Sequence, residues 1–224
     1  MTPIERLARW LENAHPTAAA SLQPGADKKA IARLSRALDD VPGAATLLDL
    51  YRWKGGQTDP LAPSLRENYT WLSIPELFEA KDMLDDMAKG GEWDDEGETW
   101  ISWWVPGWVP FFERGSDLYL VDTVGSFGGK PGQILEFLHD SEDRQIVAPS
   151  FDAWLRVWVD SLEANLWTVD DTGFIDAADA LDRFVAKRLP GYPRWKKAKK
   201  TRKAPTKTKP AAKKATTKTP RKRR

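Results

Sequence analysis

The sequence predicts an α+β protein in which helices come first, a sheet follows, and further helices end the folded part. Up to about residue 90, apolar residues recur every three or four positions, which is the spacing of amphipathic helices. From about Thr99 the pattern changes to short aromatic and β-branched stretches separated by Gly, Pro, Asp or Ser, which is typical of strands. Elements grouped by type in this way favour α+β over a strictly alternating α/β chain.

Two start signals define the first and the fourth predicted helix. Thr-Pro-x-Glu at 2–5 and Ser-x-Pro-Glu at 73–76 each combine a capping hydroxyl, an early proline and a glutamate that can close a capping box. The fourth helix is expected to end at the Gly-Gly pair 90–91. The core-facing residues are Ile4, Leu7, Ala8, Leu11 and Ala14 in the first helix and Leu77, Leu84 and Met87 in the fourth.

Periodicity also predicts helices over 27–38 and 44–53. The second of these is expected to stop at the Gly-Gly pair 55–56, because a glycine there can take the left-handed cap. The inward residues of the helix over 27–38 are Ile31, Leu34 and Leu38.

The second half of the sequence predicts an antiparallel meander followed by two helices. Ser150 caps a long helix, and a last amphipathic helix is expected near 175–189. The apolar residues of the capped helix keep helical spacing: Phe151, Trp154, Leu155, Trp158 and Leu162. The stretches with strand character are 100–115, 117–124, 132–140 and 144–150.

The net charge of +1 hides a division along the chain. Residues 194–224 hold 16 of the 34 Lys/Arg and no Asp/Glu, so residues 1–193 hold 18 basic and 33 acidic side chains, a net charge of −15. The tail is rich in Lys, Pro, Thr and Ala, and burial cannot offset the entropy of ordering it. We therefore expect one folded domain over 1–193 and a disordered basic tail over 194–224.

The 224-residue chain has no cysteine, which removes disulfides and thiolate chemistry and fits a reducing compartment. Its N-terminus is charged and amphipathic, unlike a secretory signal, and no run approaches the ~18 apolar residues of a membrane helix. These features predict a cytoplasmic protein.

The sequence lacks the common motifs of catalysis, metal binding and phosphate binding. In VGSFGGKPG, Val124 and Pro131 stand where a P-loop needs Gly and Ser/Thr, so we interpret this stretch as a connection between strands. The two histidines, His15 and His139, have no second metal ligand at helical spacing, and His139 beside Asp140 fits a turn at a strand end. We expect no metal, no cofactor and no catalytic residue, with a hydrolase using paired carboxylates as a third alternative.

Three segments together carry a resemblance to a known family. VPGAATLLDLYRWKGGQ is similar to a proline-led helix that ends in a Gly-Gly turn, although the usual Leu-Pro entry is Val41-Pro42 here. WVPFFERGSDLYLVDT is similar to a Trp-x-Pro strand, a turn and an Asp-ended strand. GGKPGQILEFLHDSEDRQIVAPSFDAWL is similar to a glycine turn, a Gly-Gln strand and a closing Ser-Phe-x-x-Trp-Leu helix. Over about residues 31–166 the chain thus resembles the SUKH superfamily, which includes fungal regulators of cell-wall synthesis (SMI/KNR type) and bacterial immunity proteins that neutralise polymorphic toxins.

The resemblance implies a single SUKH-like α+β domain with a mixed or antiparallel central sheet flanked by helices. It also implies a protein-binding role that needs no catalysis. The first candidate function is therefore a non-enzymatic module that neutralises a toxin or binds a related regulatory partner.

The acidic run over 82–98 is a candidate partner-binding patch. It holds eight acidic residues against Lys89, and their register does not match a calcium loop. Such a run is either a solvated face or a patch that attracts a basic partner and raises the association rate. The predicted patch consists of Asp85, Asp86, Asp94, Asp95, Glu96 and Glu98.

Twelve tryptophans are present, and most should belong to the core. If a strand spans 100–104, its alternation sends Trp103 and Trp104 to opposite faces. One or two aromatic residues facing outward would serve as binding anchors. The predicted aromatic rim is Trp104, Trp108, Phe111 and Phe112.

The basic tail has three candidate partners: nucleic acid, another polyanion such as an acidic protein or membrane surface, and the acidic body itself. Its composition resembles DNA-compacting tails, so the alternative function is a nucleoid-associated or regulatory protein that binds DNA or RNA non-specifically. No aromatic follows Trp195, so phosphate contacts would carry this binding. The predicted contacts are Lys196, Lys197, Lys199, Lys200, Arg202, Lys203, Lys213, Lys214, Arg221, Lys222, Arg223 and Arg224.

Overall fold

The computed structural model describes residues 1–57, 63–90, 98–100, 103–141, 143–170, 173–176, 178–197 and 200–202, with only the backbone described at 90, 98–100, 173–176, 178, 196–197 and 200–202. The helices are α1 (Pro3–Ala14), α2 (Pro16–Ser21), α3 (Lys28–Ala37), α4 (Ala44–Trp53), α5 (Ile74–Gly90), α6 (Phe151–Glu163) and α7 (Ala178–Arg188), with a 3-10 turn η1 (Ser126–Gly128). The strands are β1 (Leu22–Pro24), β2 (Lys54–Gln57), β3 (Thr70–Trp71), β4 (Glu98–Trp100), β5 (Trp108–Arg114), β6 (Asp117–Asp122), β7 (Gln133–Phe137), β8 (Asp143–Ala148), β9 (Trp167–Asp170), β10 (Gly173–Asp176), β11 (Arg194–Lys197) and β12 (Lys200–Arg202). This content confirms the predicted α+β class.

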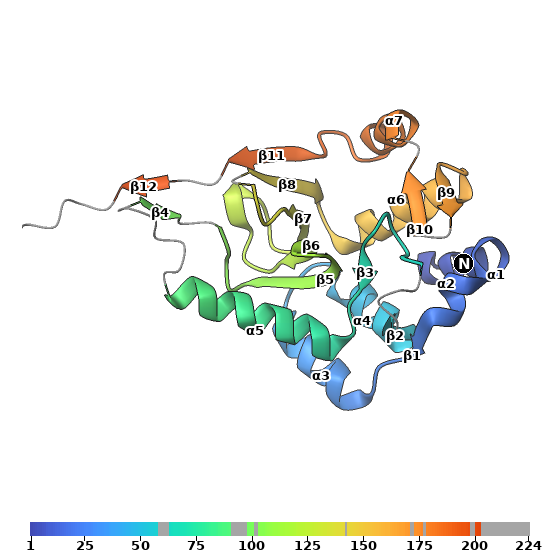
Figure 1. The fold of residues 1–224 in the computed structure, drawn as a ribbon, viewed down its shortest axis with the longest axis horizontal. Coiled ribbons are helices and arrows are strands. Elements are labelled where there is room, and N and C mark those ends of the chain that lie inside the picture. The colour runs from blue at the N-terminus through green and yellow to red at the C-terminus, as the bar shows by residue number, and fades with distance from the viewer. Residues whose placement is uncertain are drawn as a thin grey trace, which may run out of the picture.

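A six-stranded antiparallel sheet in the order β11-β8-β7-β6-β5-β3 forms the centre of the fold (Figure 1). Strands β5 to β8 are the predicted meander, because each pairs with the next along the chain. Side chains along β6 alternate between two buried clusters: Tyr119 and Val121 enter the larger one, and Leu118 and Leu120 enter the smaller one. Both faces of the sheet are therefore covered.

Two helices supply most of this cover. Helix α6 packs on β7 and β8, and its aromatic residues Phe151, Trp154 and Trp158 belong to the larger cluster. Helix α5 lies along β5 and contributes Leu84 to the smaller cluster (Figure 1). The predicted apolar stripe of α6 is thus confirmed, because its tryptophans and leucines are all buried.

Helix starts form as the sequence predicts. The Thr2 hydroxyl accepts the Glu5 N–H at 3.2 Å, and the Glu5 carboxylate accepts the Thr2 N–H at 2.7 Å. The Ser73 N–H likewise donates to Glu76 at 2.7 Å before α5, and the Ser150 hydroxyl caps α6. Backbone donors that a helix leaves unpaired at its N-terminus are therefore satisfied by these side chains.

The predicted glycine cap of α4 is wrong. Its C-cap is Lys54, with φ −142°, and the chain continues directly into β2. Gly55 and Gly56 lie inside that strand, where an added Cβ would come within 2.6 Å of the Pro24 oxygen and 2.7 Å of the Ser73 nitrogen. The glycines permit this close approach of neighbouring backbone, and Gly56 has a φ of 110° that other residues rarely adopt.

The boundary predicted at residue 194 falls at the start of a strand. Strand β11 pairs with β8, from Arg194 opposite Ile146 to Lys197 opposite Asp143, so these four residues add an edge strand to the central sheet. The pairing satisfies backbone groups that β8 would otherwise expose at the edge of the sheet. The tail residues at 198–199 and 203–224 lie outside the described residues.

Several short elements could not be predicted from the sequence. They are α2, the β1–β2 pair and the β9–β10 hairpin, each with too few residues to show a period. Ile175 belongs to β10, so the last helix begins at Ala178. Trp103 and Trp104 lie outside any strand and share the smaller cluster, so their predicted alternation is wrong.

The edge strand β11 makes a stability prediction possible. A chain that ends at Lys197 should have nearly the unfolding free energy of the full chain, because β11 is kept. A chain that ends at Pro193 should lose roughly 2 kcal/mol, since the hydrogen bonds between β11 and β8 are removed. Urea denaturation measures both values, and equal stability of the two shortened chains would contradict a structural role for β11.

Candidate binding surfaces

The glycine-rich connection between β6 and β7 is filled by the protein's own carboxylate. Buried Asp122 accepts the backbone N–H groups of Val124, Gly125 and Ser126 at 3.0, 3.1 and 2.5 Å, and the Gln133 side-chain amide at 2.7 Å. These donors point inward to an internal anion, so they do not form a phosphate cradle. The prediction of a strand connection is confirmed.

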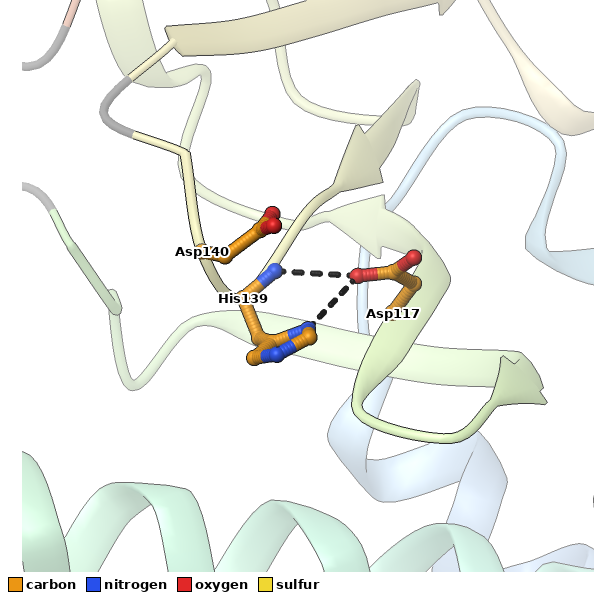
Figure 2. A group of neighbouring side chains, drawn as sticks. All are labelled: Asp117, His139 and Asp140. Atoms are coloured by element: carbon orange, nitrogen blue, oxygen red, sulfur yellow. Dashed lines mark hydrogen bonds and ion pairs between the residues drawn. The ribbon is translucent and has the colours of Figure 1, made fainter.

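Asp117, His139 and Asp140 lie close together at the end of β7 (Figure 2). One Asp117 oxygen accepts both the His139 backbone N–H at 3.0 Å and its ring Nδ1 at 2.9 Å, while Arg114 binds the other oxygen at 3.1 Å. Burial alone would raise the pKa of Asp117, but the hydrogen bonds from His139 and Arg114 hold it below its usual value. With Asp117 already committed to these partners, the group fixes the start of β6 to the end of β7, as expected for a turn histidine.

Two members of the predicted acidic patch have described side chains. The Asp85 side chain is only 16% exposed, and it accepts Lys81 Nζ and Trp104 Nε1, each at 2.7 Å. Asp86 is 79% exposed and pairs with Lys89 at the surface. Asp85 therefore holds a tryptophan in the core, and Asp86 alone of the two is available to a partner. Asp94, Asp95 and Glu96 lie outside the described residues, and Glu98 has only its backbone described.

The predicted aromatic rim is wrong. Trp104, Trp108, Phe111 and Phe112 are all buried, because the sheet is covered on both faces. Trp104 packs edge-on against Trp108, with ring centroids 5.5 Å apart. Phe111 and Phe112 lie under the tryptophans of α6. These residues contribute to core packing and offer no surface to a partner.

An acidic groove of about 610 Å³ lies where α5 meets the sheet, and sequence reasoning missed it. Three carboxylates line it: Glu76 and Glu79 from α5 and Glu113 from β5. Its apolar residues include Leu72 and Met83, and the Met83 side chain is 57% exposed. We call this surface, with lining residues Asn68, Thr70, Leu72, Glu76, Glu79, Ala80, Met83, Glu113, Arg114 and Gly115, the acidic groove.

The carboxylates of the acidic groove have few positively charged partners among the described residues. Burial and the neighbouring Glu76 raise the pKa of Glu113, which means that its negative charge lacks a favourable partner. Glu79 makes no hydrogen bond or ion pair among the described residues. Arg114 lines the groove but is paired with Asp117 at 3.1 Å. A cationic side chain from a partner would therefore be attracted here.

Part of the acidic groove could be predicted from the sequence. Glu76, Glu79 and Met83 follow the i, i+3, i+7 spacing of one helical face. Glu113 comes from a strand far along the chain, and only the fold brings it beside Glu76.

The start of the tail lies beside the acidic segment. Strand β12 pairs antiparallel with β4, and Arg202 stands opposite Glu98 in the register. This pairing brings the first tail residues to the end of the predicted acidic patch, which is the arrangement expected if the tail binds the protein's own body.

A covered antiparallel meander flanked by helices, with an acidic groove where α5 meets the sheet, defines the α+β class of this domain. The chain belongs to the SMI1 / KNR4 family (SUKH-1), whose profile matches residues 25–157, more than half of the 224 residues. This confirms the resemblance, and membership fits a protein-binding role. A search of curated proteins gives no significant match. Within the described ranges, every helix is too short or too polar to cross a bilayer.

Proposed function

We propose that the protein neutralises or regulates a basic protein partner, as immunity-type members of its family neutralise toxins, and that the acidic groove is the docking surface. The observation that carries this proposal is the set of carboxylates Glu76, Glu79 and Glu113 around exposed Met83, none of which forms an ion pair among the described residues. Such a site combines charge, which guides a partner, with an apolar contact, which can hold it.

The rest of the body supports attraction over a longer range. The net charge of −15 over residues 1–193 produces a negative field, and Asp82 and Asp86 extend the acidic face of α5. Asp94, Asp95 and Glu96, which follow α5 in the sequence, would add to it. A toxin that acts on nucleic acid has a basic surface for phosphates, and an acidic protein can cover that surface. The partner class is therefore a protein with a basic active-site face.

A charge-matched pair of variants tests the docking surface. The groove variant carries Glu76→Gln, Glu79→Gln and Glu113→Gln. The control carries Glu12→Gln, Asp49→Asn and Asp179→Asn, which remove the same total charge from α1, α4 and α7. Tagged full-length protein first captures its basic partner from the native cell after nuclease treatment, and association rates with that partner are then measured.

We expect the groove variant to associate about tenfold more slowly than the wild type, with the difference shrinking as salt screens the charges. The control should stay within about twofold of the wild type. Equal association rates for the groove variant and the control would exclude the groove as the docking surface. Thermal unfolding of both variants checks that the fold is intact.

The second candidate function is non-specific binding of nucleic acid through the tail. Strand β11 supports it, because it fixes the base of the tail to the sheet edge and leaves 13 Lys/Arg beyond Lys197. The tail would neutralise phosphates and release counterions without reading sequence.

Because β11 ends at Lys197, a truncation after this residue tests the tail without removing the edge strand. A chain ending at Lys197 keeps β11 and removes the remaining basic residues, so any loss of binding comes from the tail. We expect this chain to lose DNA retention, and full-length binding to weaken at least a hundredfold between 50 and 200 mM salt. Retention of DNA by the shortened chain at full strength would refute a role for the tail.

A further inference from the structure

Helices α3 and α5 lie side by side, and the faces that they turn to solvent carry opposite charge (Figure 1). No acidic residue interrupts α3. Its exposed basic side chains, here called the basic ridge, are Lys28, Lys29, Arg33 and Arg36. The exposed acidic side chains of α5, here called the acidic ridge, are Glu76, Glu79, Asp82 and Asp86. One surface of the protein therefore carries both charges, each on its own helix.

Among the described residues, the two ridges take part in two ion pairs. Arg33 donates to Asp82 at 3.2 Å, and its guanidinium lies 3.8 Å from the ring centre of Phe78. This contact joins the basic ridge to the acidic ridge and marks the seam between the two helices. Asp86 pairs with Lys89 of its own helix at 3.1 Å, and these side chains are 79% and 70% exposed. Both pairs lie at the surface, where a second molecule can reach them.

The other charges of this surface have no partner within the described part of the chain. The side chains of Lys28, Lys29 and Arg36 form no hydrogen bond or ion pair there, and the same holds for Glu79. Met83 lies on the same exposed side of α5 and adds an apolar contact. The basic ridge is therefore free to meet carboxylates of another molecule, and the acidic ridge is free to meet its cations.

A surface with these two ridges is complementary to itself. A two-fold axis that runs along the seam exchanges the positions of the ridges, so the basic ridge of each copy faces the acidic ridge of the other. Every contact between unlike charges then occurs twice. The full chain has a net charge of only +1, so overall repulsion between two copies is small.

We propose that this surface binds a second copy of the chain, with α3 of each protomer against α5 of the other. A second copy supplies both charges in the required order, whereas a purely acidic or a purely basic partner matches one ridge and is repelled by the other. Exposed ion pairs are individually weak and are screened by salt. The dimer is therefore weak and sensitive to salt.

The inference also bears on the proposed function. Glu76, Glu79 and Met83 belong to the acidic groove as well, so a second copy bound here would exclude a basic partner. This regulatory consequence rests on the proposed function, but the self-association does not need the partner.

Sedimentation equilibrium of the full-length protein tests the self-association. We expect dimers at about 50 mM salt and monomers at about 500 mM, because salt screens the contacts between the ridges. A protein that is monomeric at the lower salt concentration, when loaded at about 100 µM, would overturn the inference.

Two charge-reversal variants test which surface forms the dimer. One carries Lys29→Glu and Arg36→Glu in the basic ridge, and the other carries Glu79→Lys and Asp86→Lys in the acidic ridge. Each variant alone should self-associate at least about tenfold more weakly than the wild type, because like charges then face each other. An equimolar mixture of the two should form a heterodimer, because the reversed α3 of one faces the reversed α5 of the other.

The control variant carries Arg156→Glu and Lys187→Glu, which make the same change in charge as the basic-ridge variant at exposed positions of α6 and α7. Its self-association should stay within about twofold of the wild type. Thermal unfolding of all three variants checks their folds.

Two further results would overturn the inference. One is a mixture of the reversed variants that stays monomeric. The other is a basic-ridge variant that associates as tightly as the wild type, which is the result expected if the basic tail of one copy binds the acidic body of another. Neither result involves a basic partner, so the docking surface of the proposed function is tested separately by its own pair of variants.

Discussion

The packing of α6 on the antiparallel meander is the contact on which the rest of the structure depends. Trp154 lies 5.2 Å from Phe111 and 6.0 Å from both Phe112 and Tyr119, measured between ring centres, and it also contacts Trp158 of its own helix. This aromatic layer seals one face of the sheet, while the smaller cluster under α5 seals the other.

The cavity beside α5 and the cavity between α6 and α7 differ in chemistry because different elements border them. Beside α5, carboxylates from the helix and from β5 converge, and among the described lining residues Arg114 is the one cation, already paired with Asp117. Between α6 and α7, Arg66 lies among aromatic side chains together with the lining carboxylates Glu67, Glu136 and Asp182, which gives a mixed site with a negative formal charge. The first arrangement is suited to a charged macromolecular surface.

Local signals in the sequence were sufficient for the helix starts and the meander, because caps and alternation are encoded within a few neighbouring residues. The capping boxes at Thr2 and Ser73 and the cap at Ser150 form as predicted. Features that depend on contacts between residues far apart in the sequence could not be predicted in this way. The burial of Trp104 and Trp108 requires knowing that the sheet is covered on both faces, and β11 forms only because β8 offers a free edge. The groove likewise depends on Glu113 meeting Glu76 across the fold.

The central claim is that α5 and β5 form the surface that a basic protein covers. Hydrogen–deuterium exchange of the full-length chain, alone and bound to the partner it captures, measures this directly. The account predicts slower exchange in the complex at the exposed turns of α5 and at the Glu113–Gly115 end of β5, with α6 unchanged. Protection confined to α6, α7 or the N-terminal helices, with none at α5, would contradict it.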